Sequence, residues 1–183
     1  MKTLPPIALD GQSRPVVNSV AVDPETVDDP GIRACLDYWL AARGAAFAPR
    51  WSDFHLHELP AAVLPYVLVL DVAGDPPEFT YRFWGSGHTQ YHRRDYTGKK
   101  LTDMTDAWST ALLTRQYMTV MEIRRPLVFL NTYEGVEQPL RSLRMPLSDD
   151  GQAIHHMFSY VGRRGVAESL KTLFSPLASS DAP

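Results

Sequence analysis

A short alternating segment that ends at a glycine pair constrains the fold most. Residues 79–84, FTYRFW, carry a large side chain at every second position, which is typical of a β-strand. We expect Phe79, Tyr81 and Phe83 to share one face of this strand, and Trp84 to lie on the other. The GSG sequence that follows breaks the alternation and ends the strand. The segment therefore predicts one wall of an α+β fold that encloses a ligand.

Four further segments have the apolar and β-branched character of strands. They are residues 64–73, 127–133, 138–147 and 153–162. Residues 86–93 predict a short helix, and residues 106–123 carry apolar side chains at helical spacing and predict a longer one. An Asp-Gly sequence within residues 149–151 predicts a tight hairpin turn. The order of elements predicts a five-stranded antiparallel sheet with helices on one face, preceded by an N-terminal helix.

The N-terminal helix is predicted at residues 30–43. Asp29 is a suitable N-cap, and Pro30 suits the first helical position. The helix has one apolar face with Trp39 at its centre. Two interpretations stay open: this face packs on the protein's own sheet, or it pairs with a second copy of the chain.

Length and composition indicate one domain with extensions. The 183 residues suit a single domain, and the apolar fraction of 44% is enough for an ordinary core. Residues 1–28 are rich in proline and predict an extended or mobile arm. Residues 29–162 form the predicted domain, and residues 163–183 a short helix and a polar tail.

Charge and hydropathy exclude several classes of partner. The net charge of −3 offers no electrostatic attraction to nucleic acid or to an anionic membrane. Cys35 is the single cysteine, so an internal disulfide is excluded. No apolar run is long enough to span a membrane, and the first residues lack the apolar stretch of a signal peptide. We expect a cytoplasmic protein.

Several motifs together resemble a bacterial family of stand-alone PAS-type domains. YRFWGSG, followed by RDYTGKKLTDM, is similar to the family's central pattern, and MPLSDDG at residues 145–151 is similar to its late hairpin. The resemblance covers roughly residues 30–162. It implies strand order 2-1-5-4-3, counted along the chain, and a role in sensing or signal transduction. PAS-type folds often pair through a helix before the first strand, so helix 30–43 is the candidate for a homodimer contact. No effector domain fits in the remaining length, so we expect output through a protein partner.

Candidate catalytic and metal sites have little support in the sequence. The common motifs of hydrolases, nucleotide-binding proteins and zinc proteases do not occur. His88 and His92 have the spacing of one helical face, and Asp95 follows three residues later, but neither a cysteine nor a nearby glutamate completes a metal set. His55 and His57 also lack a full set of metal ligands. Ser86 lacks the flanking residues that are typical of a nucleophilic serine. We predict no metal site and no catalytic residue.

Two cofactors known in PAS-type proteins are disfavoured. Haem is held through a histidine in some relatives, but the predicted helix at residues 106–123 contains none, and His88 is the nearest candidate. Flavin photochemistry in relatives uses a cysteine in a short motif that does not occur around Cys35. The cofactor, if the protein has one, stays unknown.

Aromatic and methionine side chains gather on the elements that would enclose a cup. Such walls suit a small apolar or aromatic ligand. The predicted ligand-binding residues are Trp84, His88, Tyr91, Tyr96, Met104, Trp108, Tyr117 and Met121. The same side chains would also fill a core, so a ligand-free structural interaction domain is the main alternative. A small enzyme that uses the cavity is a further one. In the last strand, His155 and His156 should point to opposite faces.

Overall fold

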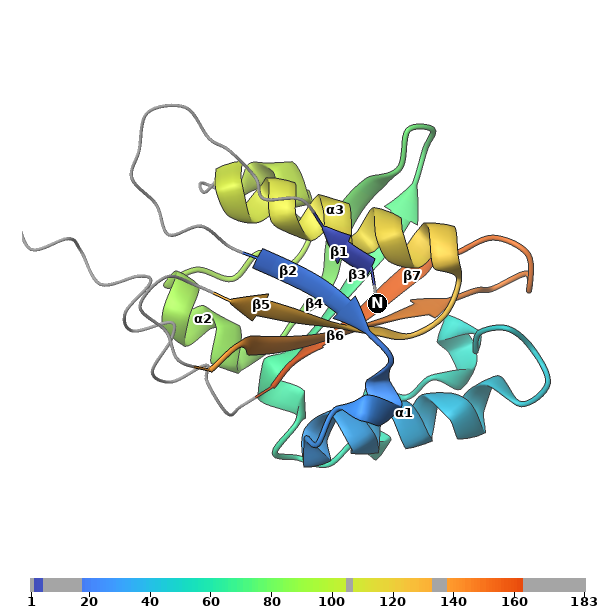
Figure 1. Cartoon of the computed structure of the whole chain (residues 1–183). Coiled ribbons are helices and arrows are strands. Elements are labelled where there is room, and N and C mark those ends of the chain that lie inside the picture. The colour runs from blue at the N-terminus through green and yellow to red at the C-terminus, as the bar shows by residue number, and fades with distance from the viewer. Residues whose placement is uncertain (1, 5–17, 105–106, 133–137, 163–183) are drawn as a thin grey trace, which may run out of the picture.

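The computed structural model describes residues 2–4, 18–104, 107–132 and 138–162. These residues form one antiparallel sheet of seven strands, in the order β1-β2-β5-β6-β7-β3-β4 (Figure 1). The strands are β1 (Lys2–Leu4), β2 (Asn18–Val22), β3 (Val67–Ala73), β4 (Glu78–Trp84), β5 (Leu127–Thr132), β6 (Leu140–Leu147) and β7 (His156–Val161). The helices are α1 (Pro30–Arg43), α2 (Ser86–His92) and α3 (Ala107–Ile123). Single 3₁₀ turns, η1 to η5, begin at Pro24, Trp51, Leu56, Leu64 and Leu101.

The sheet has two strands more than the five that the sequence predicts. β2 pairs with β5 from Asn18↔Thr132 to Val22↔Val128, and β1 pairs with β2. Ser19 and Ala21 are buried by this pairing. β2 therefore covers the edge of β5, whose backbone groups would otherwise be left open. Residues 18–22, which the sequence assigns to an arm, are part of the sheet. The helix predicted after residue 162 lies outside the described residues.

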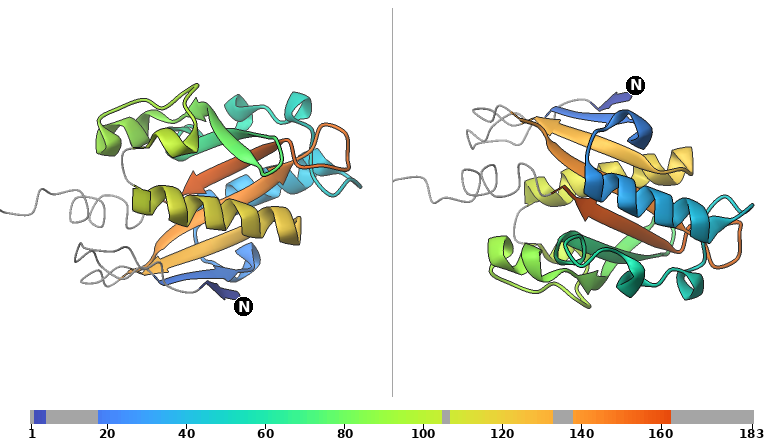
Figure 2. Two further views of the ribbon diagram at one scale, coloured as in Figure 1. Left: turned by 90° about the horizontal axis from the view of Figure 1, so that it is seen from above. Right: turned by 90° about the horizontal axis from the view of Figure 1, so that it is seen from below.

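Helices cover both faces of the sheet, because the N-terminal helix, whose face the sequence does not predict, lies opposite α3. α3 crosses one face, and α1 crosses the opposite face (Figure 2). The physical reason lies in strands that are apolar on both sides. Leu143 and Met145 of β6 pack with α1, whereas Leu70 and Met157, on β3 and β7, belong to the cluster beneath α3. A sheet that is buried on both faces needs a layer on each.

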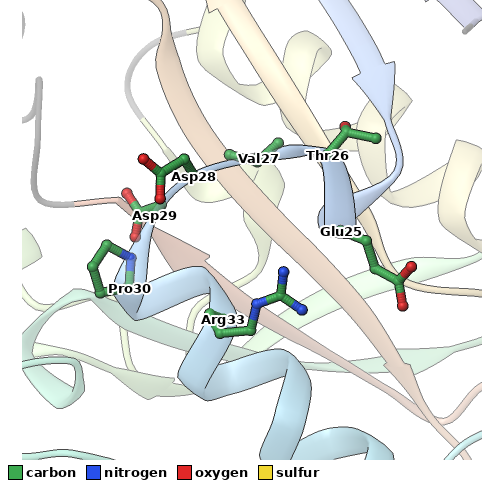
Figure 3. Close-up of a pocket in the computed structure, with 7 residues that line it drawn as sticks. All are labelled: Glu25, Thr26, Val27, Asp28, Asp29, Pro30 and Arg33. Carbon is green, nitrogen blue, oxygen red and sulfur yellow. The ribbon is translucent and has the colours of Figure 1, made fainter.

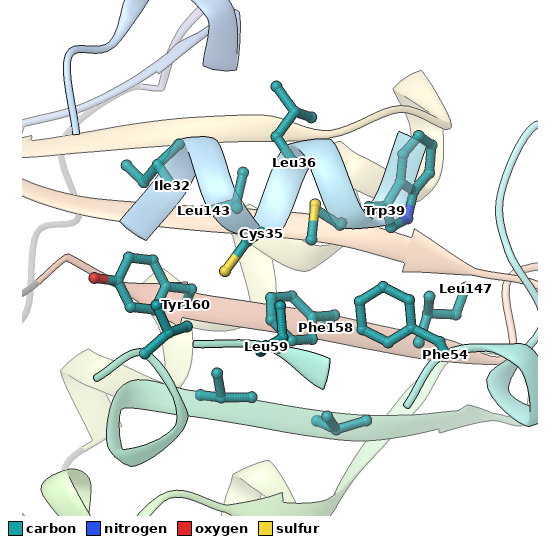
Figure 4. Packing of buried hydrophobic residues seen from close by; sticks show 14 of the residues in the cluster. Ile32, Cys35, Leu36, Trp39, Phe54, Leu59, Leu143, Leu147, Phe158 and Tyr160 are labelled. Atoms are coloured by element: carbon teal, nitrogen blue, oxygen red, sulfur yellow. The ribbon is translucent and has the colours of Figure 1, made fainter. Parts of the chain in front are cut away.

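α1 packs its apolar face on its own sheet (Figure 4). Oδ1 of Asp29 accepts hydrogen bonds from the amides of Gly31 and Ile32 at 2.9 and 3.1 Å, so the predicted N-cap is confirmed. Nε1 of Trp39 donates a hydrogen bond of 2.8 Å to the carbonyl oxygen of Pro146 in β6. Of the two interpretations of this helix, packing on its own sheet is therefore observed.

A β-bulge changes which side chains of β4 share a face. Val69 pairs with Phe83 and Leu70 with Tyr81, which leaves Arg82 as an extra residue opposite β3. Trp84 consequently joins Tyr81 in the cluster beneath α3, whereas Phe83 packs on the α1 side. The predicted grouping of Phe83 with Tyr81 is wrong for this reason.

The connection between β6 and β7 is longer than the predicted tight turn. It runs over residues 148–155, because the two strands pair only as far as Leu147↔His156. Oδ1 of Asp150 accepts hydrogen bonds from the amides of Gln152 and Ala153 at 2.7 and 2.8 Å, and Gly151 has a φ of 73°. The Asp-Gly pair does form a turn, within a wider loop.

Candidate ligand site between the sheet and helix α3

Aromatic and polar side chains from several elements meet beneath α3. Tyr81 and Trp84 come from β4, His88 from α2, Tyr117 from α3 and Arg144 from β6. All five are buried. The rings of Tyr81 and Trp84 stand edge to face with centroids 4.9 Å apart, and the ring of His88 lies 5.4 Å from that of Trp84. We call these five residues the α3-side cluster.

Two glycines fix the place of α2 and thus of His88. A Cβ atom at Gly85 would lie 2.5 Å from the carbonyl oxygen of Pro65, and one at Gly87 would lie 2.7 Å from the same oxygen. Only glycine permits this approach of backbone to backbone. The GSG sequence therefore does more than end β4: it seats α2 against the 3₁₀ turn at Leu64–Tyr66.

His88 is a neutral group at physiological pH. Burial lowers its pKa to about 3, and the positive charges of His92 and Arg144 act in the same direction, against a hydrogen bond with the backbone of Tyr66. Nε2 of His88 has no hydrogen-bond partner among the described residues. With the other ring nitrogen bonded to the Tyr66 backbone, Nε2 is left as an acceptor.

Arg144 is the largest fully buried side chain in the described part of the chain. Its Nη2 donates a hydrogen bond of 3.2 Å to Oε1 of Gln116 in α3, and its Cζ lies 5.2 Å from the centre of the Tyr117 ring. Nε and Nη1 have no hydrogen-bond partner among the described residues. A guanidinium stays charged inside a protein, so burial of these donors is costly.

Gln116 joins Arg144 to a chain of buried polar groups on the sheet. Its Nε2 donates to Oδ1 of Asn131 at 2.8 Å and lies 3.1 Å from Oγ of Ser19. Nδ2 of Asn131 lies 3.4 Å from Oγ of Ser142. The chain links α3 with β2, β5 and β6, and it holds Gln116 in the orientation that meets Arg144.

Four members of the α3-side cluster carry buried polar atoms without a partner among the described residues. Besides those of His88 and Arg144, they are Nε1 of Trp84 and the hydroxyl oxygen of Tyr117. Protein interiors pair nearly all such atoms with protein groups or with water. Ordered water or a bound molecule would supply the missing bonds of these atoms.

The structure brings together most of the side chains predicted to bind a ligand. Trp84, Tyr96, Met104 and Tyr117 are in the buried cluster beneath α3, and Met121 packs against it half-buried. His88 is buried beside Trp84. The side chains of Tyr91 and Trp108 lie outside what the structure describes.

Sequence reasoning missed Tyr81, Gln116 and Arg144. Tyr81 was placed on the face opposite Trp84, because a β-bulge is not visible in an alternating pattern. Arg144 lies between Leu143 and Met145, which suggests a solvent-facing position in a strand with one apolar face. The nearly continuous apolar sequence at residues 64–73, which holds β3, was the signal that both faces of the sheet are covered.

The other histidines and carboxylates form no metal site in the described ranges. No group of three such side chains could hold a metal ion there. The rings of His88 and His92 lie 6.4 Å apart, and those of His55 and His57 stack at 5.5 Å in the exposed segment before β3. Ser86 is exposed.

Asp95 and Arg82 each have a partner other than one another. Oδ1 of Asp95 accepts a hydrogen bond of 2.7 Å from the amide of Thr97, which braces the turn. Arg82 instead lies with Nε 2.5 Å from Oδ1 of Asp71 on the neighbouring strand β3. Cross-strand neighbours meet more readily than residues separated by α2.

His156 begins β7, whereas His155 lies in the loop before it, so the predicted alternation of the two within one strand does not apply. The ring of His156 is buried between Asp71 of β3 and Asp149 of the loop before β7, at 2.8 and 2.9 Å. His155 is half-buried, and its Nδ1 accepts from the amide of Asp149 at 3.2 Å. Neither ring belongs to the α3-side cluster.

A separate hollow of about 330 Å³ opens on the surface before α1 (Figure 3). Its lining comes from η1 and the first turn of α1, and it includes Glu25, Asp28, Asp29 and Arg33. The carboxylate of Asp29 already caps α1. We therefore do not regard this hollow as the functional site.

Comparison with known proteins gives no match: no family model, curated protein or solved structure is similar to this chain at a significant level. The resemblance to PAS-type domains therefore stays a prediction. Within the described ranges, no helix combines the length and the apolar character needed to cross a lipid bilayer.

Proposed function

We propose that this chain is a stand-alone PAS-like sensory or regulatory module that binds a small molecule between the sheet and α3. The unpaired buried atoms of Trp84, His88, Tyr117 and Arg144 carry this proposal. Each such atom costs about 1–3 kcal/mol when it is buried without a partner. A ligand that bonds to them would recover that cost.

The order of the strands supports the PAS-like part of the proposal. The five segments that the sequence predicts as strands lie side by side in the order β4, β3, β7, β6, β5. Counted along the chain, this is the order that the family resemblance implies. β2 and β1 extend the sheet beyond β5.

The two alternatives receive less support. In a ligand-free interaction domain, the polar atoms of the core would all be expected to have partners. A small enzyme would need a general acid or base, and His88, the histidine of the α3-side cluster, has its pKa lowered to about 3. A group with that pKa is a weak base at neutral pH. Sensing of a bound molecule is the function that fits these groups best.

Output would pass to a protein partner or through the packing of a homodimer. The apolar face of α1 packs on its own sheet, so a dimer through this helix would form through its outward face. That face presents Arg33, Asp37 and Leu40, which are exposed. Its mixed polar character suits a contact that rearranges rather than a permanent interface.

Native mass spectrometry and an absorption spectrum of freshly purified protein test the proposal. We expect a mass above the 20.5 kDa of the polypeptide, or a multiple of it, by the mass of one small molecule per chain. Denaturation should release that molecule. An absorption band in the visible range would identify a haem or flavin. A native mass equal to that of the polypeptide alone, in protein taken directly from cells, would contradict ligand binding.

A further inference from the structure

We infer that the ligand is a small organic acid whose carboxylate binds Arg144 in the α3-side cluster. This inference rests on the proposed function and names the chemical class of the ligand. The juxtaposition that supports it is a buried guanidinium with unpaired donors, surrounded by aromatic rings and by groups that carry no negative charge.

The first step is the charge of the cluster. Arg144 forms no ion pair with a carboxylate of the described residues, and its one polar contact there is the neutral amide of Gln116. Burial, with Tyr117 nearby, raises the pKa of the Tyr81 hydroxyl well above its usual range, so Tyr81 stays neutral. His88 is neutral as well. Within the described ranges, the positive charge of Arg144 therefore meets the face of the Tyr117 ring but no carboxylate.

The second step identifies the kind of anion that would balance the charge of Arg144. A buried charge is stable only when it is paired and hydrogen-bonded. A carboxylate brings one negative charge and accepts the bonds that Nε and Nη1 of Arg144 can donate. A phosphate dianion would bring a second charge, for which neutral His88 offers no partner. The single guanidinium therefore favours a carboxylate over a phosphate.

The aromatic and methionine side chains indicate the character of the rest of the ligand, apart from its carboxylate. The rings of Tyr81, Trp84 and Tyr96 lie within 6.3 Å of one another, and Sδ of Met104 accepts from the Tyr81 hydroxyl at 3.1 Å. Such surroundings suit an apolar or aromatic body. Nε1 of Trp84 and Nε2 of His88 offer a donor and an acceptor for one further polar group.

Matched probes test the carboxylate directly. We would measure the melting temperature and the calorimetric affinity of the full chain with phenylacetate against phenylacetamide, and with octanoate against octanamide. In each pair the apolar part is the same, and the amide lacks the negative charge of the acid. We expect each acid that binds to raise the melting temperature, and its amide to bind on the order of 100-fold more weakly, as for loss of one partner of a buried ion pair.

Arg144→Met separates a binding role from a structural one. In ligand-free protein, the variant should melt no lower than the wild type, because it removes a buried charge that lacks a counter-ion. The rise in melting temperature with the acids should vanish. Arg50→Met, a control that removes an exposed arginine from the η2 turn, should keep that rise. A large fall in the stability of ligand-free Arg144→Met would assign Arg144 a structural role and overturn the inference.

The outcomes distinguish this inference from the proposed function. If acids and amides bind equally, or if Arg144→Met binds the acids as the wild type does, the carboxylate assignment is wrong while ligand binding stands. If the protein carries no small molecule from cells and no probe shifts its melting temperature, both are wrong. A co-purified molecule that negative-ion mass spectrometry identifies as a carboxylic acid supports both.

Discussion

Nδ1 of His156 lies 2.8 Å from Oδ1 of Asp71, its register partner on the neighbouring strand β3. The other ring nitrogen lies 2.9 Å from Oδ2 of Asp149. Each ring nitrogen of His156 therefore lies within hydrogen-bond distance of a carboxylate oxygen. The ring of Trp51 lies 5.7 Å from that of His156. The imidazole thus ties β3, β7 and the loop before β7 together.

Replacing His156 with leucine should destabilise the fold by about 1–3 kcal/mol, because the buried imidazole loses its contacts with Asp71 and Asp149. Chemical denaturation at pH 7 would measure this change. His57→Leu is the control, since His57 is exposed in the η3 turn, and its effect should stay within about 0.5 kcal/mol. Equal effects of the two substitutions would show that the His156 bridge contributes nothing.

The stability supplied by Asp149 should depend on pH. Burial alone would raise the pKa of this carboxyl, but hydrogen bonds from the Trp51 amide and His156 lower it below its ordinary value. A lowered pKa means that the contribution is complete above the unfolded-state pKa of about 4 and is lost as pH falls through the folded-state pKa. Asp149→Asn should therefore be less stable than the wild type at pH 7, and the difference should shrink at pH 3.

The control for that comparison is Asp53→Asn in the exposed η2 turn. Its difference from the wild type should be small at both pH values. A difference for Asp149→Asn that grows as the pH falls would contradict the assigned direction of the pKa.

Gly85→Ala should disturb both α2 and the α3-side cluster. The new Cβ would meet the carbonyl oxygens of Pro65, Val67 and Leu64 at 2.5 to 2.8 Å, and backbone atoms cannot move aside as a flexible side chain would. We expect a loss of about 1–3 kcal/mol and a shift in tryptophan fluorescence, since Trp84 directly precedes the glycine. Ser86→Ala, at an exposed position between the two glycines, should leave the stability and the tryptophan fluorescence unchanged.

Trp39→Phe tests the attachment of α1 to the sheet. The substitution removes the hydrogen bond to the carbonyl of Pro146 and leaves a void at a buried site. The expected cost is about 1–3 kcal/mol. Leu40→Ala, on the outward face of the same helix, should cost less than 1 kcal/mol by the usual behaviour of exposed positions. A larger effect for Leu40→Ala in denaturation experiments would indicate that the outward face is itself covered in solution.

Local sequence patterns predicted the individual elements well. The bounds of α1 and its Asp29 cap agree with the sequence, because a cap and its helix lie within a few residues of one another. α2 and α3 are also close to the predicted ranges. β2 was missed, since its short NSVAV segment gains its stability from pairing with β5 and not from its own pattern.

The sequence by itself determined an α+β chain with a helix capped at Asp29, a glycine pair after the aromatic strand, and most of the aromatic side chains beneath α3. Only the tertiary structure decided that Trp84 turns to the same face as Tyr81, that α1 covers the far side of the sheet, and that Arg144 is buried beside Gln116. The physical reason is that patterns report on neighbours within a few residues. A bulge, a second covered face and a buried charge arise only when distant segments meet.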